Sequence, residues 1–154
     1  MTELRVDLAV RAPQHVVFDA LTQWPSQGAW MVATTVELIS GDGRGPGSVL
    51  RAVTGRGPLR VVDTMTVSAW EPPDRVEVRH TGRVVRGLGI FEVQAMAADR
   101  SRLVWTERLD VPLGWLGRCC WLLLRPLVAA GIRRSLRTFA ELVAAGELPA
   151  TGRT

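Results

Sequence analysis

The chain of 154 residues lacks lysine and tyrosine, and all nineteen of its basic residues are arginine. The formal net charge is only +4, so the isoelectric point near 10.8 overstates the excess of positive charge. The arginines are scattered except for Arg133, Arg134 and Arg137. A nucleic-acid site usually shows a clustered basic stripe with stacking aromatic residues. No such stripe is present in the expected strands, so we expect no nucleic-acid partner.

Cysteine is almost absent, and the two cysteines, Cys119 and Cys120, are adjacent. Neighbouring residues of a helix do not suit ordinary disulfide geometry, and no metal-ligand spacing is present. The start of the chain alternates polar and apolar residues, unlike a signal peptide. We therefore expect a cytoplasmic protein. Residues 41–47 are rich in glycine but lack the Gly-Lys-Ser/Thr ending of a phosphate loop, so a hairpin turn is favoured and no cofactor is expected.

The apolar run from Leu113 to Ile132 is interrupted by Arg118, Arg125 and Pro126. The apolar stretch between the two arginines is far shorter than the roughly 20 residues that a membrane-spanning helix needs. We therefore expect no stable membrane insertion, while a peripheral membrane contact stays open.

Hydrophobic periodicity predicts one domain over residues 1–148, followed by a disordered tail at 149–154. Strict alternation in residues 3–11 indicates a half-buried strand, and Pro13 then suits the first turn of a helix. Short turns connect the later strands, so the sheet should be antiparallel. One helix cannot cover a flat seven-stranded sheet, so the sheet should curve around it. The expected order is a strand, two short helices, six strands at about 34–40, 48–54, 59–70, 75–80, 84–96 and 103–110, and a long helix.

The final helix is expected over residues 113–148 with one buried face. Steps of three and four residues place Cys120, Leu124, Val128, Gly131, Ser135, Phe139 and Leu142 together. The arginines of the helix fall in the opposite sector, which is typical of solvent exposure. Gly131 and Ser135 are small, so either the sheet approaches closely there or space is left for a ligand. Pro126 predicts a kink or a fresh helix start.

The order of several short motifs resembles the START-like (SRPBCC) polyketide cyclase/dehydrase and lipid-transport superfamily. The resemblance covers nearly the whole chain, and each motif is short. It implies an α+β helix-grip fold, in which a curved seven-stranded antiparallel sheet wraps around a long C-terminal helix. It also implies a pocket for an apolar small molecule more firmly than it implies a reaction. The motifs are Ala12-Pro13 after the first strand, Trp24-Pro25 before Trp30, the glycine turn 41–47, Trp70 to Arg75, Trp105-Thr106-Glu107, and Pro112-Leu113-Gly114.

Alternation predicts that four ionisable side chains face the interior. Glu107 shares a face with Leu103 and Trp105, and Asp63 shares one with Met65. His80 follows Val76 and Val78, and Arg51 lies between Val49 and Val53. An ionised carboxylate buried alone costs several kcal/mol, so both acids need a partner, water or a proton. Asp63 is expected to pair with Arg51, and His80 to lie at a rim. Glu107 is either an acid/base with a raised pKa or the partner of a buried arginine.

These observations favour a protein that binds an apolar or aromatic small molecule, lipid or polyketide-like, between the sheet and the C-terminal helix. An alternative is a cyclase/dehydratase-type enzyme with Glu107 or His80 as the acid/base; a third is an interaction module that docks the helix on a protein or an anionic membrane. Without a nucleophile triad, nucleotide fingerprint or paired metal ligands, an enzyme is not favoured. A monomer or homodimer is expected. The expected ligand-binding residues are Trp30, Met65, His80, Phe91, Trp105, Glu107, Leu124, Val128, Gly131 and Ser135.

Overall fold

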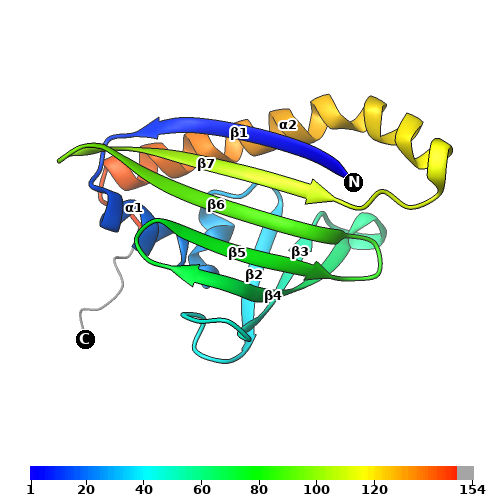
Figure 1. Ribbon diagram of the computed structural model, residues 1–154, viewed down its shortest axis with the longest axis horizontal. Helices are drawn as coiled ribbons and strands as arrows, with labels where there is room; N and C mark the ends of the chain where they lie inside the picture. Colours follow the sequence, from blue (N-terminus) through cyan, green and yellow to red (C-terminus); the bar gives the residue numbers. More distant parts are fainter. Residues whose placement is uncertain (149–154) are drawn as a thin grey trace.

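The computed structural model describes residues 1–148, so the predicted tail at 149–154 lies outside the described residues. It shows one seven-stranded antiparallel sheet with the strand order β1-β7-β6-β5-β4-β3-β2 (Figure 1). The predicted order of elements and the helix-grip fold are confirmed. The elements are β1 (Thr2–Val10), α1 (Gln14–Leu21), the 3₁₀ helix η1 (Trp24–Ala29), β2 (Thr34–Ser40), β3 (Val49–Thr54), the 3₁₀ helix η2 (Gly57–Leu59), β4 (Val61–Glu71), β5 (Arg75–Thr81), β6 (Arg86–Ala97), β7 (Arg100–Leu109) and α2 (Gly114–Ala144).

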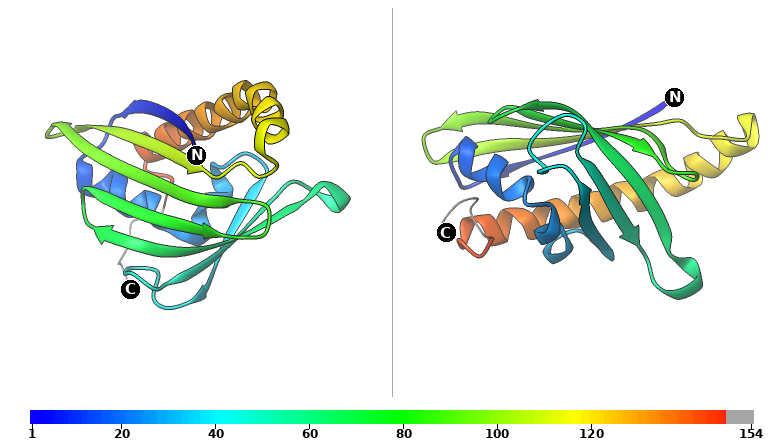
Figure 2. Two further views of the ribbon diagram at one scale, coloured as in Figure 1. Left: turned by 45° about the vertical axis from the view of Figure 1, so that its right-hand side comes forward. Right: turned by 90° about the horizontal axis from the view of Figure 1, so that it is seen from below.

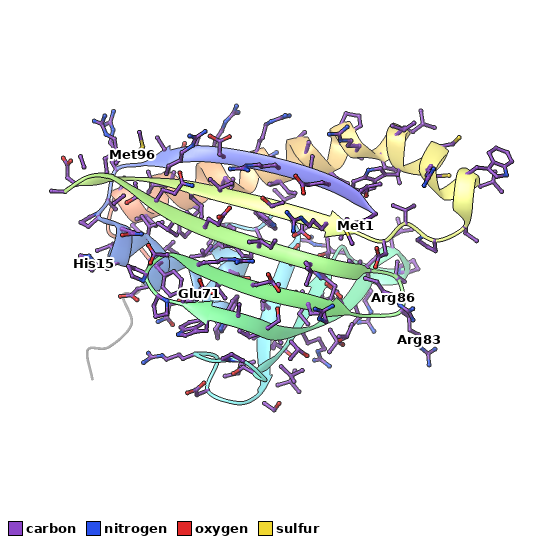
Figure 3. All side chains as sticks on the ribbon, viewed as in Figure 1. Met1, His15, Glu71, Arg83, Arg86 and Met96 are labelled. Atoms are coloured by element: carbon purple, nitrogen blue, oxygen red, sulfur yellow. The ribbon has the colours of Figure 1, made fainter. Side chains whose placement is uncertain are left out.

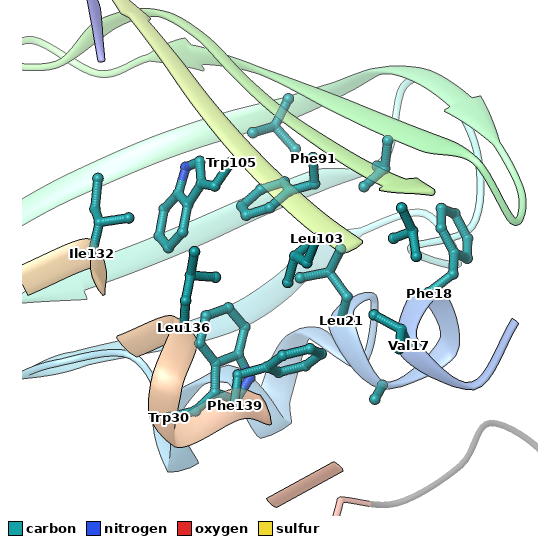
Figure 4. Packing of buried hydrophobic residues seen from close by; sticks show 14 of the residues in the cluster. Val17, Phe18, Leu21, Trp30, Phe91, Leu103, Trp105, Ile132, Leu136 and Phe139 are labelled. Atoms are coloured by element: carbon teal, nitrogen blue, oxygen red, sulfur yellow. The ribbon is translucent and has the colours of Figure 1, made fainter. Parts of the chain in front are cut away.

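The sheet is strongly curved, and its helices lie on the concave side (Figure 2). The core between sheet and helices is built around an aromatic cluster. Trp30 makes edge-on contacts with Trp105 and Phe139, at ring-centroid distances of 6.3 Å and 5.0 Å. The ring centroid of Phe91 lies 4.8 Å from that of Trp105 (Figure 4). Edge-to-face rings of this kind add to the stabilisation that comes from burying them.

The glycine turn between β2 and β3 is fixed by the indole of Trp24, whose Nε1 donates a 2.8 Å hydrogen bond to the carbonyl oxygen of Gly43. Gly43 has a φ of +74°, and a side chain there would meet the Trp24 ring at 2.9 Å. The turn therefore needs glycine for its backbone conformation and for the close approach of the ring. This contact joins two of the motifs that the sequence singled out.

Only the second half of α2 packs against the sheet. The buried residues of this half are Ala129, Ile132, Ser135, Leu136, Phe139 and Val143, whereas Gly117 in the first half is covered by Pro112 of the preceding turn. Cys120 and Leu124 are exposed, so the predicted buried face is wrong for the first half of the helix. Trp115, also considered for the core, is 72% exposed, and Trp121 is only partly buried. The first half extends past the ends of β1 and β7, where no sheet lies beneath it (Figures 1 and 2).

α2 continues through Pro126 as a single helix, so the alternative of a fresh helix start at this position is wrong. Near the middle of the helix, Gly131 and Ser135 play different parts. A methyl group added at Gly131 would meet no atom within 4 Å, so the sheet does not approach closely there. Ser135 is buried, and its hydroxyl accepts a 3.0 Å hydrogen bond from the backbone N–H of Val32. That bond attaches the segment before β2 to α2.

Candidate functional site

Three ionisable side chains form a hydrogen-bonded chain on the concave face of the sheet. His80 Nδ1 lies 2.5 Å from Asp63 Oδ2, and His80 Nε2 lies 3.2 Å from Glu107 Oε2. The indole Nε1 of Trp105 donates a 2.6 Å hydrogen bond to the other oxygen of Glu107. The three ionisable side chains are only 9–12% exposed. We refer to Asp63, His80 and Glu107 as the His80 cluster.

The strand register brings these residues together from distant parts of the chain. His80 on β5 pairs with Met65 on β4, two residues beyond Asp63, and with Gly87 on β6. Gly89 on β6 pairs with Glu107 on β7. Because side chains two residues apart on a strand point to the same face, Asp63 and Glu107 approach the imidazole from opposite sides.

Glycines on β6 leave the space that the His80 cluster occupies. A methyl group on Gly89 would lie 3.2 Å from His80 Nε2 and 3.3 Å from Glu107 Oε1. At Gly87 a methyl group would lie 1.9 Å from the carbonyl oxygen of Arg108, and φ is +134°. Gly87 therefore requires glycine, whereas Gly89 forms the floor beneath the imidazole.

The electrostatics of the site keep His80 protonated. Burial alone would lower the pKa of His80, because it disfavours the charged imidazolium. The hydrogen bonds to Asp63 and Glu107 and the charges of both carboxylates act in the opposite direction and outweigh it. Together they raise the pKa of His80 from 6.5 to about 10. One positive group thus sits between two acidic groups, and Asp63 Oδ1 is buried without a hydrogen-bond partner among the described residues.

The expected pairing of Asp63 with Arg51 is wrong. Arg51 pairs in register with Thr64 rather than Asp63, so it points to the other face and forms an exposed 2.7 Å ion pair with Glu37. Leu50 and Ala52 are the inward residues of β3. Glu107 contacts Trp105 and His80 instead of a buried arginine. His80 is largely buried rather than placed at a rim, and its pairing with Asp63 was not predicted from the sequence.

The predicted ligand-binding residues are only partly brought together. Trp30, Phe91 and Trp105 fill the core beside Phe139, and Met65 is buried on the strand that carries Asp63. Val128 and Gly131 are partly buried, whereas Leu124 is 52% exposed. A hollow of about 190 Å³ lies between β1 and α2, and another of about 290 Å³ lies over residues such as Arg75 and Glu92. Neither is lined by the His80 cluster.

The curved sheet that holds a C-terminal helix defines a helix-grip protein, and comparison with known proteins identifies the family. Residues 1–144 match the family described as polyketide cyclase / dehydrase and lipid transport. The chain belongs to this family, as its motifs indicated.

Similar solved structures have the same fold. A protein from Thermus thermophilus has a TM-score of 0.79 at 16% identity, over 94% of this chain and 99% of that one. The Zhui aromatase/cyclase from a Streptomyces species, R1128, has a TM-score of 0.77 at 18% identity, over 99% of both chains. A norcoclaurine synthase from Thalictrum has a TM-score of 0.69 at 16% identity, over 95% of this chain and 96% of that one. No curated protein matches the sequence.

Proposed function

We propose that the protein binds an apolar or aromatic small molecule, lipid or polyketide-like, on the concave face of the sheet. The observation that carries the proposal is the His80 cluster, a polar group set into an otherwise apolar face. A ligand site of this kind needs mostly apolar walls and a few precisely placed polar groups. Membership of the polyketide cyclase / dehydrase and lipid transport family supports the same class of ligand.

The position expected for the ligand depends on which parts of the concave side are already filled by side chains. The aromatic cluster occupies the centre of the grip, so the ligand lies toward the first half of α2. Space exists on this side, because nothing lies within 4 Å of a methyl group at Gly131, and Leu124 is not covered by the sheet. Trp105 belongs to the aromatic cluster and orients Glu107 through its indole N–H. The polar end of the ligand would contact His80 and Glu107.

An enzyme of the cyclase/dehydratase class, with Glu107 or His80 as the acid/base, is the second candidate. The direct contact of the two groups favours it, because proton transfer needs hydrogen-bond distance. The raised pKa of His80 weighs against it. A general acid or base works best when its pKa lies near the working pH, and about 10 is far above neutral. The His80 cluster therefore fits a charged anchor for a ligand better than a proton donor at neutral pH.

The test is titration of the purified protein with fatty acids, aromatic polyketides and flat aromatic amines, followed by tryptophan fluorescence. We expect saturable binding of at least one of these ligand classes. His80→Gln should weaken the binding, and His15→Gln should leave it unchanged; His15, the other histidine of the chain, lies on α1 and serves as the matched control. Turnover of a bound polyketide with a bell-shaped pH profile would favour the enzyme instead. Failure of every ligand to bind the folded wild-type protein would overturn the proposal.

A further inference from the structure

One end of the molecule combines exposed apolar residues with an excess of arginine. The β3–β4 turn, the β5–β6 turn and the last residues of β7 lie at the same end of the sheet. The register shows this, because Thr54 pairs with Val61, Thr81 with Arg86, and Leu109 with Gly87. The first half of α2 extends from this end (Figures 1 and 2). We refer to residues 55–60, 82–86 and 113–127 as the basic end.

Every segment of the basic end carries an exposed apolar side chain. Leu59 is 85% exposed in the first turn, and Val84 is exposed in the second. In α2 the exposed apolar residues are more numerous. They are Trp115, Leu116, Leu122, Leu123, Leu124 and Leu127. A soluble domain seldom leaves this much contiguous apolar surface without a partner.

The amphipathic character of α2 is reversed between its two halves. Steps of seven residues place Arg118 and Arg125 on the row that continues as Ile132 and Phe139, which are buried. Leu116 and Leu123 lie on the row that continues as Ala130 and Arg137, which are exposed. The first half thus directs leucines away from the sheet and leaves their side chains exposed.

The charge of the basic end has one sign. Its three segments contain no acidic residue, and six arginines there are exposed: Arg56, Arg60, Arg83, Arg86, Arg118 and Arg125. Within residues 1–148 none of the six forms an ion pair. The nearby acids are Asp110, after β7, Glu3, which is already paired with Arg108, and Asp63 and Glu107, which are buried against His80. Figure 3 shows Arg83 and Arg86 at this end and Met96 at the opposite end.

We propose that the basic end docks on an anionic lipid bilayer. Leucine and tryptophan side chains bury into the boundary between headgroups and acyl chains, while arginines bind the phosphate groups. A second copy of the chain fits less well, because a two-fold interface would bring the same arginines together with few acids to balance them. α2 contains an 18-residue stretch with a mean hydropathy of 1.3, which is apolar enough for a membrane span, and only 17% of that stretch is buried in the protein. Arg118 and Arg125 make lying in the interface more favourable than crossing the bilayer.

The test is co-sedimentation of the full chain with vesicles of phosphatidylcholine alone or mixed with phosphatidylglycerol. We expect binding only to the anionic vesicles, and a loss of roughly tenfold or more when salt shortens the Debye length from about 10 Å to about 3 Å. Two double variants should each weaken binding roughly tenfold. One combines Trp115→Ser with Leu116→Ser, and the other combines Arg60→Glu with Arg83→Glu. Met96→Ser and Arg44→Glu are matched controls at exposed positions away from the basic end, and should leave binding unchanged.

Three results would overturn the proposal. They are equal binding to neutral vesicles, equal losses in the controls, and no binding by a folded wild-type protein. Light scattering after gel filtration adds a separate readout. If Trp115→Ser with Leu116→Ser converts a dimer to a monomer and vesicle binding is absent, a second copy covers this surface instead. Ligand titration of the same variants separates this proposal from the proposed function, because the substituted residues are exposed and none of them belongs to the His80 cluster.

Discussion

His80 and Asp63 are seventeen residues apart in sequence, yet His80 Nδ1 lies 2.5 Å from Asp63 Oδ2. The contact exists because β4 and β5 pair in an antiparallel register that places His80 opposite Met65. It gives a histidine on an apolar sheet face a permanent charge partner. Glu107 on the other ring nitrogen completes the arrangement.

Replacement of His80 by glutamine should destabilise the protein by about 2–4 kcal/mol near neutral pH, because two buried acids lose their positive partner. A raised pKa in the folded state contributes stability that is fully present below 6.5 and is lost as the pH rises through about 10. The difference in unfolding free energy between wild type and His80→Gln should therefore narrow between these pH values. Urea unfolding across this range measures it. A constant difference would contradict the assignment, and His15→Gln serves as the control.

The two acids should differ in their effect on the imidazole. Both raise the pKa of His80; the hydrogen bond to Asp63 contributes more than that to Glu107, whereas the charge of Glu107 contributes more than that of Asp63. The shorter contact of His80 with Asp63, 2.5 Å against 3.2 Å with Glu107, favours the larger effect for Asp63. Asp63→Asn and Glu107→Gln should each lower the pKa of His80, the first by more. Nuclear magnetic resonance titration of the imidazole signals gives the order directly. The reverse order, or no change in either variant, would show that the carboxylates do not hold the proton; Glu92→Gln on β6 is a matched carboxylate control.

The glycines of β6 offer a contrast within one strand. Gly87→Ala should abolish or strongly impair folding, because the added methyl group would meet the Arg108 carbonyl oxygen at 1.9 Å. Gly89→Ala should fold, since its nearest neighbours at 3.1–3.3 Å are side chains that can shift. Gly89→Ala should weaken ligand binding, because the methyl group would displace the side chains of His80 and Glu107. Thermal unfolding and fluorescence titration separate the two effects. Equal ligand affinity in Gly89→Ala and wild type would place the ligand elsewhere.

Substitutions of Ser135 should mainly lower the stability of the fold. Ser135→Ala removes the acceptor for the Val32 N–H and should cost about 1 kcal/mol, and Ser135→Leu should cost about 1–3 kcal/mol by overpacking a buried position. Thr138→Ala is the control, because Thr138 Oγ1 only donates to Arg134 of its own helix at an exposed site. Denaturant unfolding checks all three. Wild-type stability in Ser135→Leu would mean that unfilled space surrounds this residue.

Much of the fold could be predicted because strand alternation is regular where one face is buried. The strict alternation of β1 and the pattern of Val76, Val78 and His80 on β5 identified the inward side chains correctly. β3 was different, because apolar residues occur on both of its faces. Arg51 has apolar sequence neighbours on both sides, namely Val49, Leu50, Ala52 and Val53. Periodicity alone therefore did not show which face of the sheet Arg51 points to. The register decided it, and with it the partner of Asp63.

The long helix was predicted correctly, but its predicted buried face was wrong in the first half for a related reason. Periodicity shows which residues share a face, but it does not show what that face meets. The row through Leu124 and Val128 is apolar or small except at Ser135, and it is buried only where the sheet lies beneath it. Beyond the end of β7 the same pattern faces solvent. Only the arrangement in space shows that the amphipathic character of α2 reverses, and the basic end was hidden from the sequence for that reason.

The most direct test of the account is native mass spectrometry of freshly purified protein, comparing wild type, His80→Gln and His15→Gln. The account predicts a co-purified apolar or aromatic small molecule on wild type and on His15→Gln, released by gentle activation, and its loss from folded His80→Gln. Equal retention of the molecule by His80→Gln would contradict the central claim that the His80 cluster anchors the ligand.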